Sequence, residues 1–164
     1  MRKTCQEKYV PRLPYRRVSV NILEFWGISY LVPTDAYSKW LDIVPMKGKT
    51  AKHVIEACRT VFAVHGNPQI LVSDNVPFNS IEFLRFARNK FQCNFSSLKF
   101  AQSNELAEKG THIAKQLLLK CNETQTDYRD ELYAYRNMPI PGLRASPSQL
   151  FFSQSVRTAC PITV

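Results

Sequence analysis

The chain has 164 residues, and 22 Lys and Arg against 13 Asp and Glu give it a formal net charge of +9. This length predicts one domain. Hydrophobic residues make up 45% of the chain and aromatic residues 12%, which is enough for a buried core and excludes wholesale disorder. So large a basic excess indicates an anionic partner, either nucleic acid or an acidic membrane surface.

The basic excess is concentrated at the start of the chain. Residues 1–17 carry six basic side chains and one acidic side chain, as a solvated tail or a phosphate-contacting arm would. The five cysteines are odd in number and no two are closely spaced, which argues against a disulfide framework. No apolar run approaches the length of a membrane span, and no signal peptide is evident. We therefore expect no membrane partner and a cytoplasmic or nuclear location.

Hydrophobic periodicity predicts a mixed α/β chain. In order, the expected elements are strands at 17–23, 28–34 and 39–45, a helix at 50–65, a strand at 69–73, a helix at 80–90, a strand at 92–96, and helices at 104–121, 127–137 and from Ser146 onward. Close spacing makes the first three strands an antiparallel meander. A strand that follows a helix indicates a parallel crossover. Pro33 requires a bulge, an edge position or a damaged strand, since proline cannot donate to a ladder.

Two acidic residues stand at informative places. Asp74 directly follows the strand 69–73, and ligands of open α/β sheets gather at the carboxyl ends of strands. Glu108 lies in the first turns of the helix 104–121, off its apolar stripe, where a carboxylate also favours the helix dipole. Carboxylates brought together repel one another, and Mg²⁺ or Mn²⁺ removes that repulsion. Two such ions catalyse attack on phosphate.

A site of this kind normally needs a third carboxylate. The first strand offers Asn21 in place of an aspartate, and three other acids lie nearby in the sequence: Glu24, Asp35 and Asp42. None of the three is favoured by its spacing alone. For Asp35, a role as a turn or hydrogen-bonding residue at the end of a strand is the alternative, and the family resemblance described next favours it.

Five sequence runs, taken together and in order, resemble one known family. They are RVSVNILEFWGISYLV, DAYSKWLDIVPMKGKTA, HGNPQILVSDN, QSNELAEK and AYRNMPIPGLRASPSQLFF. The chain resembles the catalytic core of retroviral-type integrases, above all those of gypsy-type retrotransposons and of host genes derived from them. The resemblance covers residues 16–161, and implies that residues 1–15 are a basic arm left from a zinc-binding module.

The resemblance implies a ribonuclease-H-like fold: a mixed sheet of three antiparallel and then parallel strands, flanked by helices. It further implies a D-D-E triad that binds two Mg²⁺ ions and catalyses strand transfer of DNA. Asp74 matches the second acid of the triad and Glu108 the third, so these two would be the metal ligands. Asn21 occupies the position of the first acid. Expected DNA contacts come from the start of the long helix and the run before it, at Gln102, Asn104, Lys109 and Lys115.

The chain also departs from the family pattern. The neutral Asn21 cannot supply the anion that should bridge two cations, although an amide oxygen still ligates weakly. Val76 stands where the family has glycine, and a glutamine in the next turn is missing. One further residue is lost before the QSN run, so the spacing from Asp74 to Glu108 is two residues shorter than usual.

Three functions are compatible with this pattern. The first is an integrase-like domain that binds nucleic acid but is catalytically impaired by Asn21, acts in the nucleus and forms a homodimer. The second is an active Mg²⁺-dependent strand transferase or endonuclease. The third, of another class, is a protein-interaction or dimerisation module without a DNA role. Because binding needs Lys and Arg rather than a triad, the +9 charge favours the first function.

Overall fold

The computed structural model describes residues 11–95, 105–154 and 157. A five-stranded sheet has the order β3-β2-β1-β4-β5, with β1 at its centre. The strands are β1 (Arg17–Phe25), β2 (Ile28–Asp35), β3 (Val44–Met46), β4 (Ile70–Ser73) and β5 (Gln92–Phe95). β1, β2 and β3 pair antiparallel, whereas β4 pairs parallel to both β1 and β5. The predicted antiparallel meander followed by parallel strands is confirmed.

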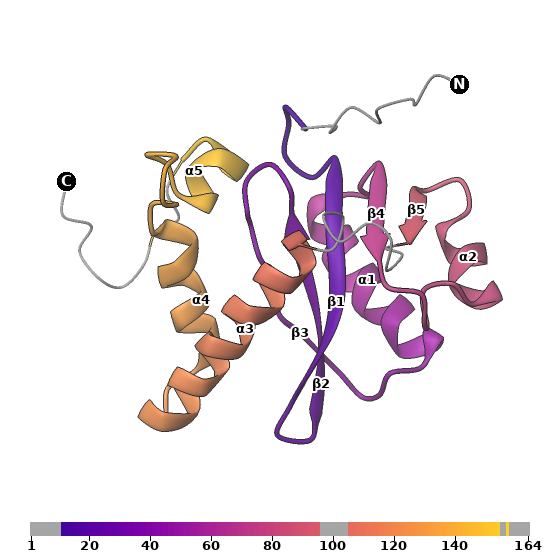
Figure 1. Cartoon of the computed structure of the whole chain (residues 1–164), viewed down its shortest axis with the longest axis horizontal. Coiled ribbons are helices and arrows are strands. Elements are labelled where there is room, and N and C mark those ends of the chain that lie inside the picture. The colour runs from indigo at the N-terminus through magenta and orange to yellow at the C-terminus, as the bar shows by residue number, and fades with distance from the viewer. Residues whose placement is uncertain (1–10, 96–104, 155–156, 158–164) are drawn as a thin grey trace, which may run out of the picture.

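Helices cover both faces of the sheet (Figure 1). They are α1 (Ala51–His65), α2 (Ile81–Ala87), α3 (Glu105–Thr124), α4 (Tyr128–Asn137) and α5 (Pro147–Phe152). One core cluster joins α1 and α2 to the sheet, and a second joins α3 and α4 to its other face. In the part of the chain that is described, no helix is both long enough and apolar enough to cross a membrane.

Alternation along β1 assigns its side chains to the two faces. Val18 and Val20 belong to the core on the α1 side, and Leu23 belongs to the core on the α3 side. Because successive strand residues point to opposite faces, Asn21 shares the α3 face with Leu23. This parity decides which helix covers the site described below.

The third predicted strand is shorter than expected. The sequence pattern predicted 39–45, but β3 begins only at Val44. Trp40 and Leu41 are buried, yet they lie in an irregular segment that joins β2 only through an isolated bridge between Thr34 and Leu41. Their apolar character reflects packing against neighbouring helices and not strand formation. Burial without a ladder is the reason that periodicity misplaced this element.

Pro33 lies in β2, an interior strand, where the ladder on one side is interrupted, which matches the damaged strand among the alternatives that its presence required. It pairs with Val20 on one side, while β3 reaches only as far as Leu31 on the other. The predicted limits of α1 are confirmed to within one residue. Thr50 is the N-cap residue, but its hydroxyl bonds to His53 instead of capping the helix, and Gly66 ends the helix with φ of 83°.

The boundary between arm and domain at residues 15 and 16 stays a prediction. Tyr15, the last residue assigned to the arm, is buried against Phe62 and Phe151. Its backbone N–H donates to the Asp35 carboxylate at 2.9 Å. The described end of the arm therefore packs on the sheet.

Gly110 sets the approach of α3 to the sheet. An added Cβ would lie 2.1 Å from Thr34 Oγ1 and 3.2 Å from Thr34 Cβ. We expect Gly110→Ala to destabilise the chain by about 1–3 kcal/mol, as overpacking of a close contact does. Urea unfolding measures this change. His112→Ala, at an exposed position of the same helix, is the control, and equal stability of the two variants would contradict the close packing.

Candidate functional site

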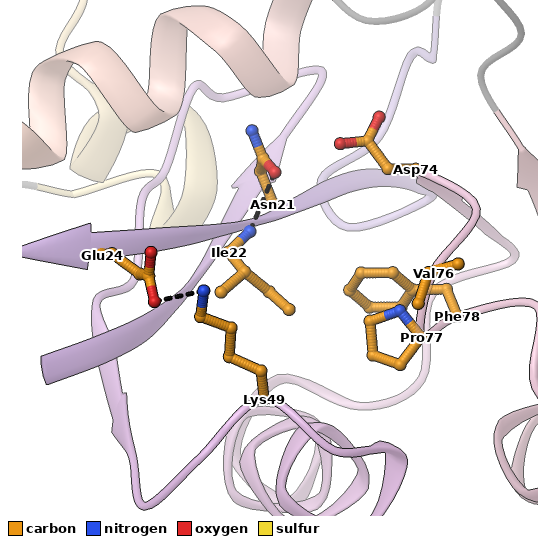
Figure 2. A pocket seen from close by; sticks show the side chains of 8 residues that line it. All are labelled: Asn21, Ile22, Glu24, Lys49, Asp74, Val76, Pro77 and Phe78. Carbon is orange, nitrogen blue, oxygen red and sulfur yellow. Dashed lines mark hydrogen bonds and ion pairs between the residues drawn. The ribbon is translucent and has the colours of Figure 1, made fainter.

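The register between β1 and β4 brings two of the predicted site residues together. Ser19 pairs with Val72 in this parallel ladder. Asn21 and Asp74 each lie two residues further along, so the same register sets them on neighbouring chains and on the same face. Figure 2 shows the Asp74 carboxyl group turned toward Asn21.

Asn21 and Asp74 line a pocket of about 340 Å³ at this end of the sheet. Its walls come from the second half of β1, the segment before α1 and the segment after β4, and the remaining lining residues are Ile22, Glu24, Lys49, Val76, Pro77 and Phe78. The floor is apolar and the rim is polar (Figure 2). A polar rim at the carboxyl ends of parallel strands is where open α/β sheets bind ligands.

The Asn21 amide is committed to the backbone. Its Oδ1 accepts a hydrogen bond from the Ile22 N–H at 2.9 Å. Figure 2 shows the amide nitrogen pointing away from Ile22. The amide NH₂ therefore offers donors to the space around it, while the amide oxygen keeps a second lone pair and carries no net charge.

Glu108, the third predicted site residue, lies outside this pocket. It is exposed in the first turns of α3, and α3 begins beside the middle of β1 (Figure 1). The structure thus places Glu108 on the helix that covers the Asn21 face, but it is not among the residues that line the pocket. Gln102 and Asn104 fall outside the described residues.

Two of the predicted DNA-contacting residues lie along α3. Lys109 is exposed and its Nζ lies 2.9 Å from Glu105 Oε1. Lys115 is exposed and, among the described residues, no ion pair involves it. It follows Glu108 by seven residues, or two helical turns, so the two share one side of the helix. Lys120, further along, donates to Glu131 at 2.7 Å, and this hydrogen bond raises the pKa of Lys120.

The three alternative acids each have another role. Glu24 forms an ion pair with Lys49. Asp35 is buried and accepts hydrogen bonds from the Tyr15 N–H, the Ser38 N–H and the Ser38 hydroxyl, the last at 2.6 Å. The interpretation of Asp35 as a hydrogen-bonding residue at a strand end is confirmed.

Asp42 belongs to a buried junction remote from the pocket. Arg136 Nη2 on α4 donates to Asp42 Oδ1 at 2.7 Å, and His65 Nε2 lies 3.2 Å from Asp42 Oδ2. The Arg136 guanidinium also lies 4.0 Å from the centre of the Trp40 ring. Burial lowers the pKa of Arg136, but a guanidinium stays protonated at neutral pH. This junction fastens α4 to the sheet.

The donor set at the pocket fits a pair of divalent cations poorly. Over the described ranges, no group of three or more His, Cys, Asp or Glu side chains is placed to hold a metal ion. The pocket supplies the Asp74 and Glu24 carboxylates, and Lys49 neutralises Glu24. Mg²⁺ prefers a near-complete shell of oxygen ligands that balances its charge, and the neutral Asn21 amide contributes no charge to that balance.

Lys49 is the pocket residue that sequence reasoning missed. The signal was present in the sequence, since Lys47, Lys49 and Lys52 follow one another before and into α1. Only the structure shows that Lys49 reaches β1 and pairs with Glu24 (Figure 2).

No protein-family model matches the chain. Among curated proteins, it is 26% identical over 157 residues to the uncharacterized protein K02A2.6 of Caenorhabditis elegans, which covers 91% of the chain. It is 28% identical over 103 residues to the intracisternal A-particle Pol-related polyprotein of the mouse intracisternal A-particle MIA14, which covers 61% of the chain. The chain spans 12% of the length of each of these relatives.

Solved structures of integrases have the same fold. The simian T-cell lymphotropic virus intasome in complex with the PP2A regulatory subunit B56 gamma aligns with a TM-score of 0.78 and 20% identity, over 95% of this chain and 63% of that one. The HTLV-2 integrase catalytic core domain in complex with magnesium, in its trimeric form, aligns with a TM-score of 0.68 and 19% identity. That alignment covers 85% of this chain and 97% of that one. The catalytic core domain of BIV integrase aligns with a TM-score of 0.70 and 14% identity, over 85% of this chain and 95% of that one. The chain therefore has the fold of retroviral integrase catalytic cores, and the resemblance to retroviral-type integrases that its motifs indicated is confirmed.

Proposed function

We propose that this chain is a DNA-binding domain related to DNA integration that is catalytically impaired by Asn21. The observation that carries the proposal is the position of Asn21 across from Asp74, at the rim of one pocket. An integrase-type reaction places two divalent cations among carboxylates to stabilise charge on phosphate. Here a neutral amide stands where the first carboxylate would, so Mg²⁺ or Mn²⁺ is expected to bind weakly.

Binding of DNA does not require the missing carboxylate. Phosphate contacts need Lys and Arg, and the chain keeps a net charge of +9. Lys115 lies on the same side of α3 as Glu108, two turns further along, and it is exposed. A duplex that passed over the start of α3 would therefore meet a lysine whose charge no described carboxylate neutralises.

The proposal also includes an oligomeric state and a cellular location. A homodimer is expected, and a catalytic core domain of HTLV-2 integrase has been solved in a dimeric form. Action on DNA would place the chain in the nucleus.

Salt dependence of DNA affinity tests this function. We expect the chain to bind a short duplex at low salt and to lose roughly tenfold or more in affinity between about 50 and 200 mM salt, because bound Lys and Arg displace counterions from phosphates. Fluorescence anisotropy of a labelled duplex measures the dissociation constant at each salt concentration. Absence of binding at low salt, or an affinity that salt does not change, would contradict a phosphate-driven mode.

A matched pair of α3 variants makes this test specific. Lys115→Ala is expected to reduce the slope of log affinity against log salt by about one unit, the effect of one lost phosphate contact. Lys120→Ala is the control, since the Lys120 ammonium already donates to Glu131. If log affinity fell equally steeply with log salt in both variants, Lys115 would not contact a DNA phosphate.

A further inference from the structure

The turn between β1 and β2 holds a tryptophan in an unfavourable conformation. Phe25 pairs with Ile28, which leaves a two-residue turn, Trp26-Gly27, with φ of 52° and 75°. Tight hairpins need positive φ at both positions, and Asn-Gly is the preferred sequence. A tryptophan with positive φ costs folding free energy, and such outliers are found where function maintains them.

The Trp26 side chain is also held out in solvent. It is 74% exposed, whereas Trp40, the other tryptophan of the chain, is 5% exposed. The Phe25 ring lies 6.1 Å from the Trp26 ring between centroids and limits where the indole can go. The turn projects beyond the sheet at the end opposite α5 (Figure 1), while the first residue of α4, Tyr128, packs on Tyr30 behind it. An exposed indole on a strained backbone contributes little to folding. The groups around it therefore indicate which kind of ligand it binds.

One exposed lysine lies beside this turn. Ser29 pairs with Met46, so Lys47, the next residue after β3, lies beside the start of β2. Lys47 is exposed, and no described carboxylate forms an ion pair with it. Glu24, which would repel a phosphate, is neutralised by Lys49. The tip therefore combines a projecting aromatic ring with an ammonium group and a compensated carboxylate.

This combination matches the chemistry of a nucleotide in a single strand. Aromatic side chains stack on bases of any sequence, and lysines contact the phosphates that connect them. An apolar protein surface would match it less well, because Ile28 is the one other large apolar residue exposed in the turn and its flanking pair. β1 also connects the tip to the pocket, since Asn21 and Trp26 are five residues apart, or roughly 17 Å along an extended strand.

We propose that Trp26 is a stacking platform for an unpaired base of a DNA strand whose phosphates contact Lys47 and which continues toward the Asn21–Asp74 pocket. The inference rests on the proposed function, because it requires that the chain binds DNA. It adds a preference for DNA with an unpaired region over a blunt duplex.

Substitution of Trp26 separates stacking from folding. Trp26→Asn creates the sequence that this turn prefers, so the variant is expected to fold at least as stably as the wild type. Its affinity for a short oligothymidine should fall by about five- to a hundredfold, the loss of one stacked base. Trp26→Phe keeps a ring under the same backbone strain and should stay within about threefold of wild type. Affinity for a blunt duplex of equal length should change less.

Fluorescence reports on the indole itself. In Trp40→Phe the only tryptophan of the chain is Trp26, and saturating oligothymidine should quench its emission. Unchanged emission at saturation, or wild-type affinity in Trp26→Asn, would overturn the inference while leaving the DNA-binding function intact. If the wild-type chain binds neither oligonucleotide, the proposed function fails and this inference with it. If Trp26→Asn abolishes self-association and leaves both affinities unchanged, the tip is an interface between copies, which also overturns the inference.

Discussion

Replacing Asn21 with aspartate is expected to create a Mg²⁺ site and to raise Mg²⁺-dependent nicking of DNA by about ten- to a thousandfold. The second carboxylate would lie across the β1–β4 register from Asp74, and metal-held charge contributes several kcal/mol to phosphate chemistry. Nicking of a supercoiled plasmid measures the rate. Asn21→Asp combined with Asp74→Asn is the control, since it restores the original number of carboxylates and should lose the gain.

The same variant has a readout that does not depend on activity. Without metal, two facing carboxylates repel each other, so Asn21→Asp should be less stable than the wild type. Addition of Mg²⁺ should raise its melting temperature by about 3–11 °C more than that of the wild type, as a ligand at ten to a hundred times its dissociation constant does. An Asn21→Asp chain with neither this shift nor faster nicking would show that other departures from the family pattern disable the site.

Removal of the Arg136 side chain is expected to destabilise the fold by about 3–5 kcal/mol. Its guanidinium donates to the Leu41 carbonyl from Nε at 3.1 Å and from Nη2 at 2.7 Å, and also to Asp42 Oδ1. In Arg136→Ala the Asp42 carboxylate and the Leu41 carbonyl would lose these donors in a buried place, and breaking a buried ion pair has a cost of this size. Chemical denaturation with urea measures the free energy of unfolding.

An exposed arginine on the same helix provides the matched control. Arg129 is bonded to Asp127 at the surface, and this contact lowers the pKa of Asp127 to about 2. Arg129→Ala should change stability little, because solvent screens exposed ion pairs. If Arg136→Ala and Arg129→Ala unfolded at the same urea concentration, the junction of Arg136, Asp42 and Trp40 would not fasten α4 to the sheet.

Local pattern was sufficient to predict much of the fold, whereas the assignment of Asn21 to a site came from the family resemblance and stays a prediction. Alternation along β1 and the short apolar strand before Asp74 are local signals. The β1–β4 register then sets Asn21 and Asp74 at the same end of the sheet. Caps were predictable from local signals too. Ser146, followed by proline, begins α5 with a capping box.

Features that depend on distant partners were not predictable. Trp40 and Leu41 look like strand residues, but Trp40 packs on Arg136 and on Phe151, whose ring centroid lies 4.9 Å away. Asp42 is a metal-ligand candidate in sequence, yet Arg136 binds it from 94 residues away. The same holds for Lys49, which neutralises Glu24. Each of these roles is fixed by tertiary packing, and periodicity carries no information about it.

Binding and cleavage measured in one reaction distinguish an impaired DNA-binding domain from an active nuclease. The wild-type chain is incubated at low salt with a labelled duplex and Mg²⁺, the bound fraction is read by anisotropy, and the products are read on a denaturing gel, with Asn21→Asp in parallel. We predict that the wild-type chain binds the duplex and leaves it uncut, while Asn21→Asp binds it and nicks it. Wild-type cleavage at the rate of Asn21→Asp would contradict catalytic impairment by Asn21. Absence of wild-type binding would contradict the DNA-binding function.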